Sequence, residues 1–328
     1  MITVLSRKII LATFLILILV ASMVIYLWQG MIPRSIPTEY ETAHLVSSND
    51  APRLFNPNWN SDGTALIATS EEIFPGGYGI LYIIDLTTGK MKNITNNNES
   101  GFYERAIWSP SGDYVAFWTN TMTLDGIGTI NIDSLETKFI ATGQFVSWSR
   151  NNELAIADVL SGDATRSAIV TIVPFNGENP IKIFELKANY PIFTGIAWSP
   201  DGNYIAFGIS LTNDLNEDVP TTLFIIDKKG NTKLQIIDED ISSVSWTPDS
   251  KRVIYFSVVE SSHVSLFKVI DFEGKCMEFQ SFIWPMGGPK FSYDGSKIAF
   301  SSLESKIYIA ETKSIFGEGF WEDGEICR

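Results

Sequence analysis

One short pattern recurs six times along this chain, and no other feature of the sequence limits its fold as strongly. The clearest copy spans residues 196–207 and reads Ile-Ala-Trp-Ser-Pro-Asp-Gly-Asn-Tyr-Ile-Ala-Phe. Its first three residues are typical of a strand end, Ser-Pro-Asp-Gly of a tight turn, and the last four of a returning strand. Proline presets the turn, aspartate bonds its own backbone, and glycine accepts a positive φ. Each copy therefore predicts one β-hairpin.

The aromatic residue before each turn gives the spacing of the repeat. These residues are Trp59, Trp108, Trp148, Trp198, Trp246 and finally Phe291. A third strand is expected in each repeat at 81–85, 129–133, 169–173, 223–227, 267–271 and 307–310, and most repeats continue into a fourth, such as 233–237. Four short strands at a period of about 40–50 residues are typical of a propeller blade. The sequence thus predicts an all-β fold, a six-bladed β-propeller of four-stranded antiparallel blades.

The repeat also resembles a known family. Trp-Ser-Pro-Asp-Gly followed by Ile-Ala-Phe, with Tyr-Ile-Ile-Asp later in the unit, is similar to the PD40-type repeat of TolB-like propellers, a WD40-like group. The resemblance covers residues 51 to about 311. It implies a six-bladed propeller that serves as a binding platform, and it implies no catalytic residue, because the matched positions are structural. One tryptophan per blade is expected in the core between blades rather than in a ligand site.

The two ends of the repeat region each leave a strand without a partner. The last repeat has no clear fourth strand, while residues 39–46 have strand propensity but precede the first complete blade. The simplest solution makes this N-terminal segment the outer strand of the blade that contains Phe291, which would hide two sheet edges. In the alternative, the tail supplies that strand through Phe316 and residues 320–321.

Residues 9–28 contain no charged side chain and are almost entirely apolar. Twenty residues at 1.5 Å each match the roughly 30 Å hydrocarbon core of a bilayer. The apolar run continues past residues 21–22, which form a poor cleavage site, so we expect an uncleaved transmembrane signal-anchor helix rather than a secretory peptide. Arg7 and Lys8 then place residues 1–8 in the cytoplasm. Residues 29–37 would form a linker, and residues 38–328 a propeller in the periplasm or at the cell exterior.

The charge of the chain excludes one class of partner. A formal charge of −14 and a pI near 4.6 disfavour nucleic acid, which requires basic surfaces. The expected partners are therefore the membrane, through the single helix, and a protein or glycan.

The chain also lacks cofactor and catalytic motifs. It has no zinc pattern, nucleophile elbow or phosphate-binding loop, so no cofactor, metal or catalytic residue is predicted. The weak exception is a calcium candidate at Asp214, Asn216 and Asp218, which lacks the glycine and the distal glutamate of a calcium loop. A solvated acidic loop is the simpler interpretation.

The only two cysteines are Cys276 and Cys327. An even number in an oxidising compartment favours a disulfide, which would fix the tail across the fifth and sixth blades. The alternative is one buried and one exposed thiol.

In a four-stranded meander, the loops from strand two to three and from strand four to the next blade emerge on one face, opposite the tight turns. These loops are predicted to be long, at 71–79, 96–105, 119–128, 158–167, 187–195, 210–221 and 280–289. Aromatic rings beside charged groups suit recognition, and the candidate ligand-binding residues are Phe74, Tyr78, Phe102, Tyr103, Glu104, Arg105, Tyr190, Phe193 and Trp284. The sequence thus predicts a membrane-anchored, non-enzymatic binding module. The alternative is a lyase or hydrolase with its site at the channel mouth.

Overall fold

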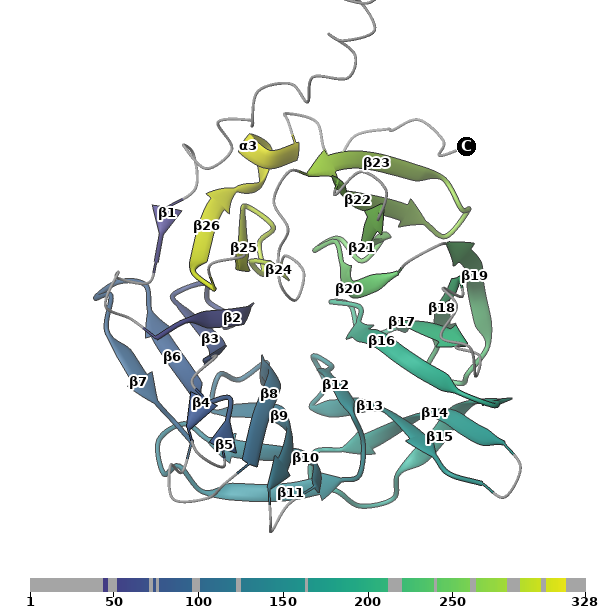
Figure 1. The fold of residues 1–328 in the computed structure, drawn as a ribbon, viewed down its shortest axis with the longest axis horizontal. Helices are drawn as coiled ribbons and strands as arrows, with labels where there is room; N and C mark the ends of the chain where they lie inside the picture. The colour runs from purple at the N-terminus through teal and green to yellow at the C-terminus, as the bar shows by residue number, and fades with distance from the viewer. Residues whose placement is uncertain are drawn as a thin grey trace, which may run out of the picture. The chain divides into compact units, whose positions relative to one another are not determined.

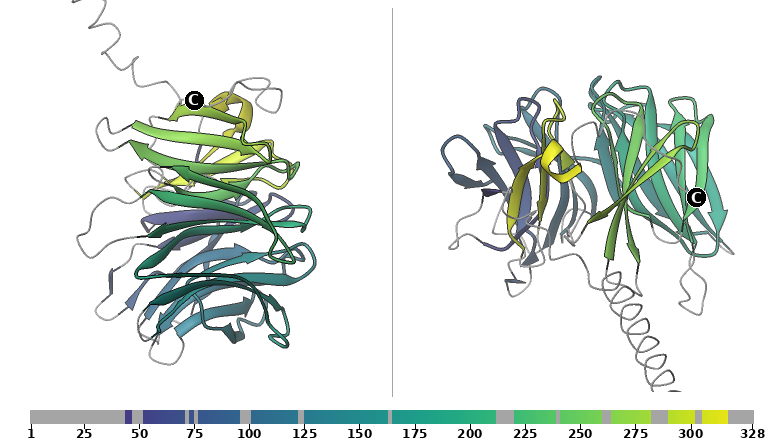
Figure 2. Two further views of the ribbon diagram at one scale, coloured as in Figure 1. Left: turned by 90° about the vertical axis from the view of Figure 1, so that its right-hand side faces the viewer. Right: turned by 90° about the horizontal axis from the view of Figure 1, so that it is seen from above.

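The computed structural model of the chain describes residues 44–46, 52–70, 73–74, 77–95, 101–121, 125–162, 165–211, 220–238, 241–259, 264–281, 290–301 and 305–316. Six antiparallel meanders follow one another around a central channel, which confirms the predicted six-bladed propeller (Figure 1). In the two edge-on views the strands run from one face of the ring to the other (Figure 2).

The four strands of each blade follow one another from the channel outwards. Blade 1 is β2 (Leu54–Trp59), β3 (Ala65–Ser70), β6 (Leu81–Asp85) and β7 (Met91–Asn93). Blade 2 is β8 (Gly101–Trp108), β9 (Tyr114–Thr121), β10 (Asp125–Asn131) and β11 (Thr137–Ala141). Blade 3 is β12 (Phe145–Trp148), β13 (Glu153–Leu160), β14 (Arg166–Pro174) and β15 (Ile181–Ala188).

Blade 4 is β16 (Pro191–Trp198), β17 (Tyr204–Leu211), β18 (Thr221–Asp227) and β19 (Thr232–Asp238). Blade 5 is β20 (Ser242–Trp246), β21 (Arg252–Val259), β22 (Val264–Asp271) and β23 (Cys276–Ser281). Blade 6 is β24 (Lys290–Phe291), β25 (Lys297–Ser301), β26 (Ile307–Glu311) and β1 (His44–Leu45), and β26 leads into the short helix α3 (Thr312–Phe316).

The N-terminal strand closes the ring, as predicted. β1 pairs with β26 in antiparallel register, with His44 opposite Ile309, and the Val46 amide donates to the Ile307 carbonyl oxygen at 3.0 Å. Val46 also packs against the core shared by blades 1 and 6. The alternative that Phe316 forms this strand is wrong, since Phe316 ends α3.

The repeated tryptophans lie in the core between blades, as the resemblance implies. All five are buried, and each core cluster joins side chains from neighbouring blades. Two indoles also bond across a seam: Trp59 Nε1 donates to the Lys290 carbonyl oxygen at 2.8 Å, and Trp246 Nε1 to that of Ala197 at 3.0 Å. The tryptophan therefore fills the seam in five blades, and at Trp59 and Trp246 it also fixes the backbone of a neighbouring innermost strand.

Carboxylates at the ends of third strands hold hairpin turns, as expected, with one correction. Asp85, Asp227 and Asp271 each accept backbone amides of the following turn at 2.8–2.9 Å. In blade 2 this role belongs to Asn131, which accepts the amides of Asp133 and Ser134 at 3.1 and 2.9 Å. Asp133, predicted at the strand end, lies inside the turn, because β10 ends two residues earlier than predicted.

Several of the predicted long loops are shorter than expected. Strand pairing continues as far as Leu160 opposite Ser167 in blade 3, and β8 and β16 begin at Gly101 and Pro191. The connection between β3 and β6 adds a hairpin, β4 (Ile73–Phe74) and β5 (Gly77–Tyr78), and β5 pairs in parallel with β8. Much of the predicted 96–105 and 187–195 loops therefore belongs to innermost strands.

No helix among the described residues is long and apolar enough to cross a membrane. The predicted signal anchor at 9–28 and its flanks at 1–8 and 29–37 lie outside those residues.

Candidate ligand site at the channel mouth

The central channel contains two cavities, one towards each end. The cavity at the end where the innermost strands begin has a volume of about 520 Å³, and we call it the long-loop cavity. The second, of about 430 Å³, lies beside the tight turns among the blade tryptophans. Asn58, Ile107, Ile196 and Lys290 line both. These four residues therefore form the boundary between the two halves of the channel.

A repeated bulge shapes the long-loop cavity. In β2, β8, β16 and β20 the register shifts a few residues before the tryptophan. Asn56, Arg105 and Ser243 each lie three residues before a tryptophan, and their φ angles are 53°, 55° and 52°. A positive φ is strained for a residue with a side chain, and bulges redirect side chains at functional sites. All three residues line the long-loop cavity.

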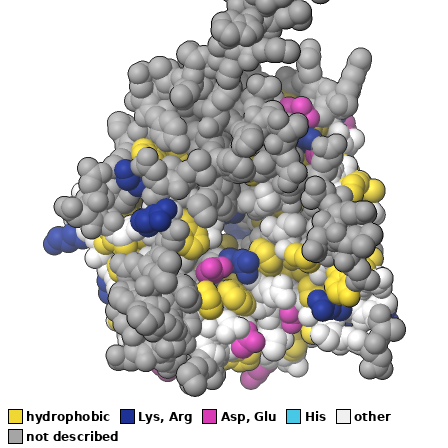
Figure 3. Space-filling view, in the orientation of Figure 1, with side chains coloured by type: hydrophobic (Ala, Val, Ile, Leu, Met, Phe, Trp, Pro, Cys, Tyr) yellow, Lys and Arg dark blue, Asp and Glu magenta, His cyan; other side chains and the backbone are white. Residues whose placement is uncertain are grey.

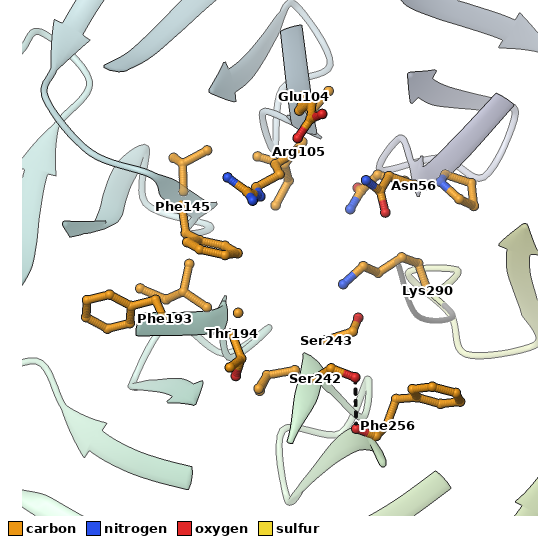
Figure 4. A pocket seen from close by; sticks show the side chains of 18 residues that line it. Asn56, Glu104, Arg105, Phe145, Phe193, Thr194, Ser242, Ser243, Phe256 and Lys290 are labelled. Atoms are coloured by element: carbon orange, nitrogen blue, oxygen red, sulfur yellow. Dashed lines mark hydrogen bonds between the residues drawn. The ribbon is translucent and has the colours of Figure 1, made fainter. Parts of the chain in front are cut away.

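Arg105 enters the cavity from β8 (Figure 4). Its Nη1 donates to the carbonyl oxygen of Gln144 at 2.9 Å, and its guanidinium carbon lies 4.0 Å from the ring centre of Phe145 and 5.3 Å from that of Trp118. Desolvation lowers the pKa of Arg105, although the neighbouring Glu104 carboxylate opposes this effect. Arg105 stays charged, because its ordinary pKa lies above 12.

Lys290 enters the same cavity from β24, and Figure 4 shows its amine pointing towards the centre. Its backbone is fixed by the bond that its carbonyl oxygen accepts from Trp59. Burial lowers the pKa of Lys290 to about 8, and among the described residues no carboxylate or hydrogen bond offsets this effect. Near the centre of the face drawn in Figure 3, basic and acidic side chains meet among hydrophobic ones at a hollow.

The structure separates the candidate ligand-binding residues into groups. Glu104 and Arg105 line the cavity together, with Phe193 at its wall. The Tyr103 ring instead packs in the core of blades 1 and 2, 5.6 Å from Phe117, and the Phe193 ring packs against Phe207. Tyr103 therefore presents no open ring face.

Phe102 and Tyr190 are exposed, and the guanidinium of Arg166 lies 5.2 Å from the Tyr190 ring centre. Phe74 and Tyr78 form the β4–β5 hairpin. Trp284 and the calcium candidates Asp214, Asn216 and Asp218 lie outside the described residues. Within those residues, no group of three or more His, Cys, Asp and Glu side chains could hold a metal ion.

Sequence reasoning missed Asn56, Ser243 and Lys290. One signal was available: the position three residues before the blade aromatic carries Asn, Arg, Phe, Gly, Ser and Gly in the six repeats, where an ordinary strand favours β-branched residues. Such residues suit a bulge, because glycine and asparagine tolerate a positive φ.

Cys276 is buried and disulfide-bonded. Its predicted partner, Cys327, lies outside the described residues, so the pairing stays a prediction.

No protein-family model and no curated protein sequence matches the chain. Solved structures do resemble it. TolB from Agrobacterium tumefaciens aligns over 79% of this chain and 90% of its own, with TM-score 0.55 and 14% identity. TolB from Acinetobacter baumannii aligns over 92% and 68%, with TM-score 0.53 and 11% identity. An oligogalacturonate lyase from Vibrio parahaemolyticus aligns over 82% and 93%, with TM-score 0.52 and 13% identity. The chain thus has the six-bladed fold of TolB-like propellers, a fold that also carries an enzyme.

Proposed function

We propose that this chain is a membrane-anchored, extracytoplasmic binding module that holds a protein or glycan on its long-loop face, with part of the ligand in the long-loop cavity. The observation that carries the proposal is the cavity itself. Three of its polar side chains, those of Asn56, Arg105 and Ser243, sit on strained bulges, and no carboxylate or hydrogen-bond partner within the described residues offsets the burial of Lys290. Proteins keep strain and uncompensated charge mainly where function requires them.

Exposed apolar side chains at the long-loop ends of blades 2–4 also support this face as the binding surface. Of the exposed large hydrophobic side chains among the described residues, six lie at the ends of blades 2–4 where the long loops emerge: Phe102, Leu160, Tyr190, Ile192, Leu211 and Ile237. Three, Leu135, Ile181 and Tyr293, lie at or beside turns on the opposite face. Clustered apolar side chains beside a cavity are typical of an interaction surface.

The proposal can be tested by capture from envelope extract with the full chain in detergent micelles. Replacing both Phe102 and Tyr190 with serine should weaken capture by at least about tenfold, because exposed aromatic anchors carry much of an interface's binding energy. The matched control replaces Leu135 and Tyr293 with serine on the opposite face and should capture normally. If the control loses capture while the first variant retains it, and both are folded, the face is assigned wrongly.

The apolar segment at 9–28 and the preceding Arg7 and Lys8 support the anchored arrangement. Protease added to spheroplasts should digest the propeller and leave the N-terminus intact. A protected propeller would contradict this part of the proposal.

One observation favours the enzyme alternative. A lysine with a pKa of about 8 beside an arginine could, as the free amine, remove the proton next to a carboxylate, because general bases work best near the ambient pH. The electron pair would form a C=C bond as the glycosidic C–O bond breaks, and the leaving oxygen would take a proton from water. Oligogalacturonate, the substrate in the name of one similar structure, is a suitable probe. Formation of an unsaturated product by the wild type, and none by Lys290→Met, would establish lyase activity.

A further inference from the structure

We infer that the long-loop cavity recognises a carboxylate side chain of a peptide segment, which Arg105 and Lys290 bind from two sides. The inference rests on the proposed binding function and names the chemistry of its ligand. Both side chains enter one cavity from different blades, Arg105 from β8 and Lys290 from β24 (Figure 4).

The charge of this cavity differs in sign from that of the whole chain. The chain carries −14 overall. Among the residues that line the cavity, Arg105 and Lys290 are positive and Glu104 is negative, which leaves one net positive charge. An anionic group that enters would therefore be attracted locally, in a desolvated site where Coulomb interactions are stronger than in water.

Arg105 is prepared to bind such a group. One of its terminal nitrogens is fixed by the Gln144 carbonyl oxygen, and its planar face lies over the Phe145 ring. The guanidinium has five N–H donors, so others remain for a carboxylate. Because the side chain is already held in place, little rotamer entropy is lost on binding.

Lys290 supplies the second cation, and the desolvation of its amine is what an anionic ligand would offset. The carbonyl bond from Trp59 fixes its backbone at the boundary between the two cavities. The negative charge of a carboxylate beside its amine would oppose the pKa decrease that desolvation now causes.

The apolar part of the wall suits a peptide, and Asn56, Thr194, Ser242 and Ser243 add polar groups elsewhere in the lining. Ile107, Phe145, Val146, Ile196 and Phe256 line the cavity beside the cations. These side chains offer no hydrogen bond to the hydroxyl groups that surround a sugar ring. They suit the apolar side chains that flank a glutamate or aspartate in a peptide.

The test uses the full chain in detergent micelles and acetylated, amidated peptides that carry one glutamate between apolar residues, each paired with its glutamine counterpart. Glutamate peptides should bind at least about tenfold more tightly than glutamine peptides, because hydrogen bonds to charged groups are the stronger ones. Arg105→Gln and Lys290→Met should each remove most of this difference. Lys297→Met, on the exposed side of the neighbouring strand β25, should not change it.

The pH dependence provides an independent readout. Among the lining residues, Arg105 and Glu104 are the ionisable groups that share the cavity with Lys290, and β2, β12, β16 and β20 add none. The affinity of the wild type for glutamate peptides should decrease in alkaline buffer, because Lys290 loses its proton. The affinity of Lys290→Met should not show this decrease.

Equal binding of glutamate and glutamine peptides, or binding of no peptide, would overturn the inference. Binding of oligogalacturonate alone, with the same dependence on Arg105 and Lys290, would replace the peptide by an acidic glycan. If Phe102→Ser with Tyr190→Ser abolishes envelope capture while Arg105→Gln and Lys290→Met retain it, the carboxylate assignment fails and the proposed binding face stands.

Discussion

Lys290 shows how a single residue can serve a site at the expense of the fold's stability. Its amine is desolvated without an offsetting partner, so the charged form is disfavoured and its pKa falls to about 8. In the unfolded chain a lysine titrates near about 10.4. Between these two values the unfolded state binds more protons than the folded state, so stability rises with pH over this window. Below about 8 both states hold the proton, and the contribution of Lys290 stays at its lowest value.

Replacing Lys290 with methionine should therefore increase the free energy of unfolding at neutral pH by about 1–2 kcal/mol, since an uncompensated and partly buried charge becomes an apolar side chain of similar length. Urea denaturation at neutral pH and at about pH 9.5 measures this directly, and the gain should shrink at the higher pH. The exposed Lys297→Met serves as the control and should change little. Equal destabilisation by both variants at both pH values would contradict the explanation.

At the scale of the element, the innermost strand of a blade does two tasks in a few residues. The tryptophan near its end fills the seam between blades, and the bulge three residues earlier directs a side chain into the channel. Gly79, which follows β5, packs closely against the backbone of β8. Its φ is 73°, and an added Cβ would lie 2.6 Å from the Tyr103 carbonyl oxygen. The backbone of β8 therefore has little room to shift next to Tyr103, and a residue that replaces Arg105 must fit the existing bulge.

The bulge predicts opposite preferences at two neighbouring asparagines of β2. At Asn56, where φ is 53°, glycine should be more stable than valine by about 1–3 kcal/mol, because a β-branched residue is strained there. At Asn58, which pairs with Ile67 in the ladder, valine should be more stable than glycine, by up to about 1 kcal/mol. Chemical denaturation of the four variants measures both differences. The same preference at both positions would show that the bulge does not control Asn56.

At the scale of the whole molecule, two residues of β1 close a ring of six sheets. They cover the edge of β26, and Val46 continues the contact with its bond to Ile307 and its packing against the core of blades 1 and 6. Unpaired sheet edges promote aggregation, so this short segment has a protective role as well as a stabilising one.

A chain that begins at residue 38 should unfold cooperatively, whereas a chain that begins at residue 52 should lose at least about 2 kcal/mol of stability, from the Val46 burial and the strand hydrogen bonds. The shorter chain should also associate through the open edge of β26. Thermal unfolding and size-exclusion chromatography measure the two effects. Equal stability and a monomeric state for both chains would mean that β1 is dispensable.

The sequence by itself determined the architecture, because its repeats report local physics. Each tight turn of the repeat, each aromatic residue before it and each strand of β-branched residues depend on near neighbours. An unmatched strand at each end predicted the closure by β1. Only the tertiary structure decided the candidate site. Asn56, Arg105 and Lys290 are far apart in the chain and meet because the innermost strands of different blades surround one axis. The sequence assigned Arg105 and Tyr103 to a loop. Strand pairing places both in β8, where the bulge turns Arg105 into the channel while Tyr103 packs in the core.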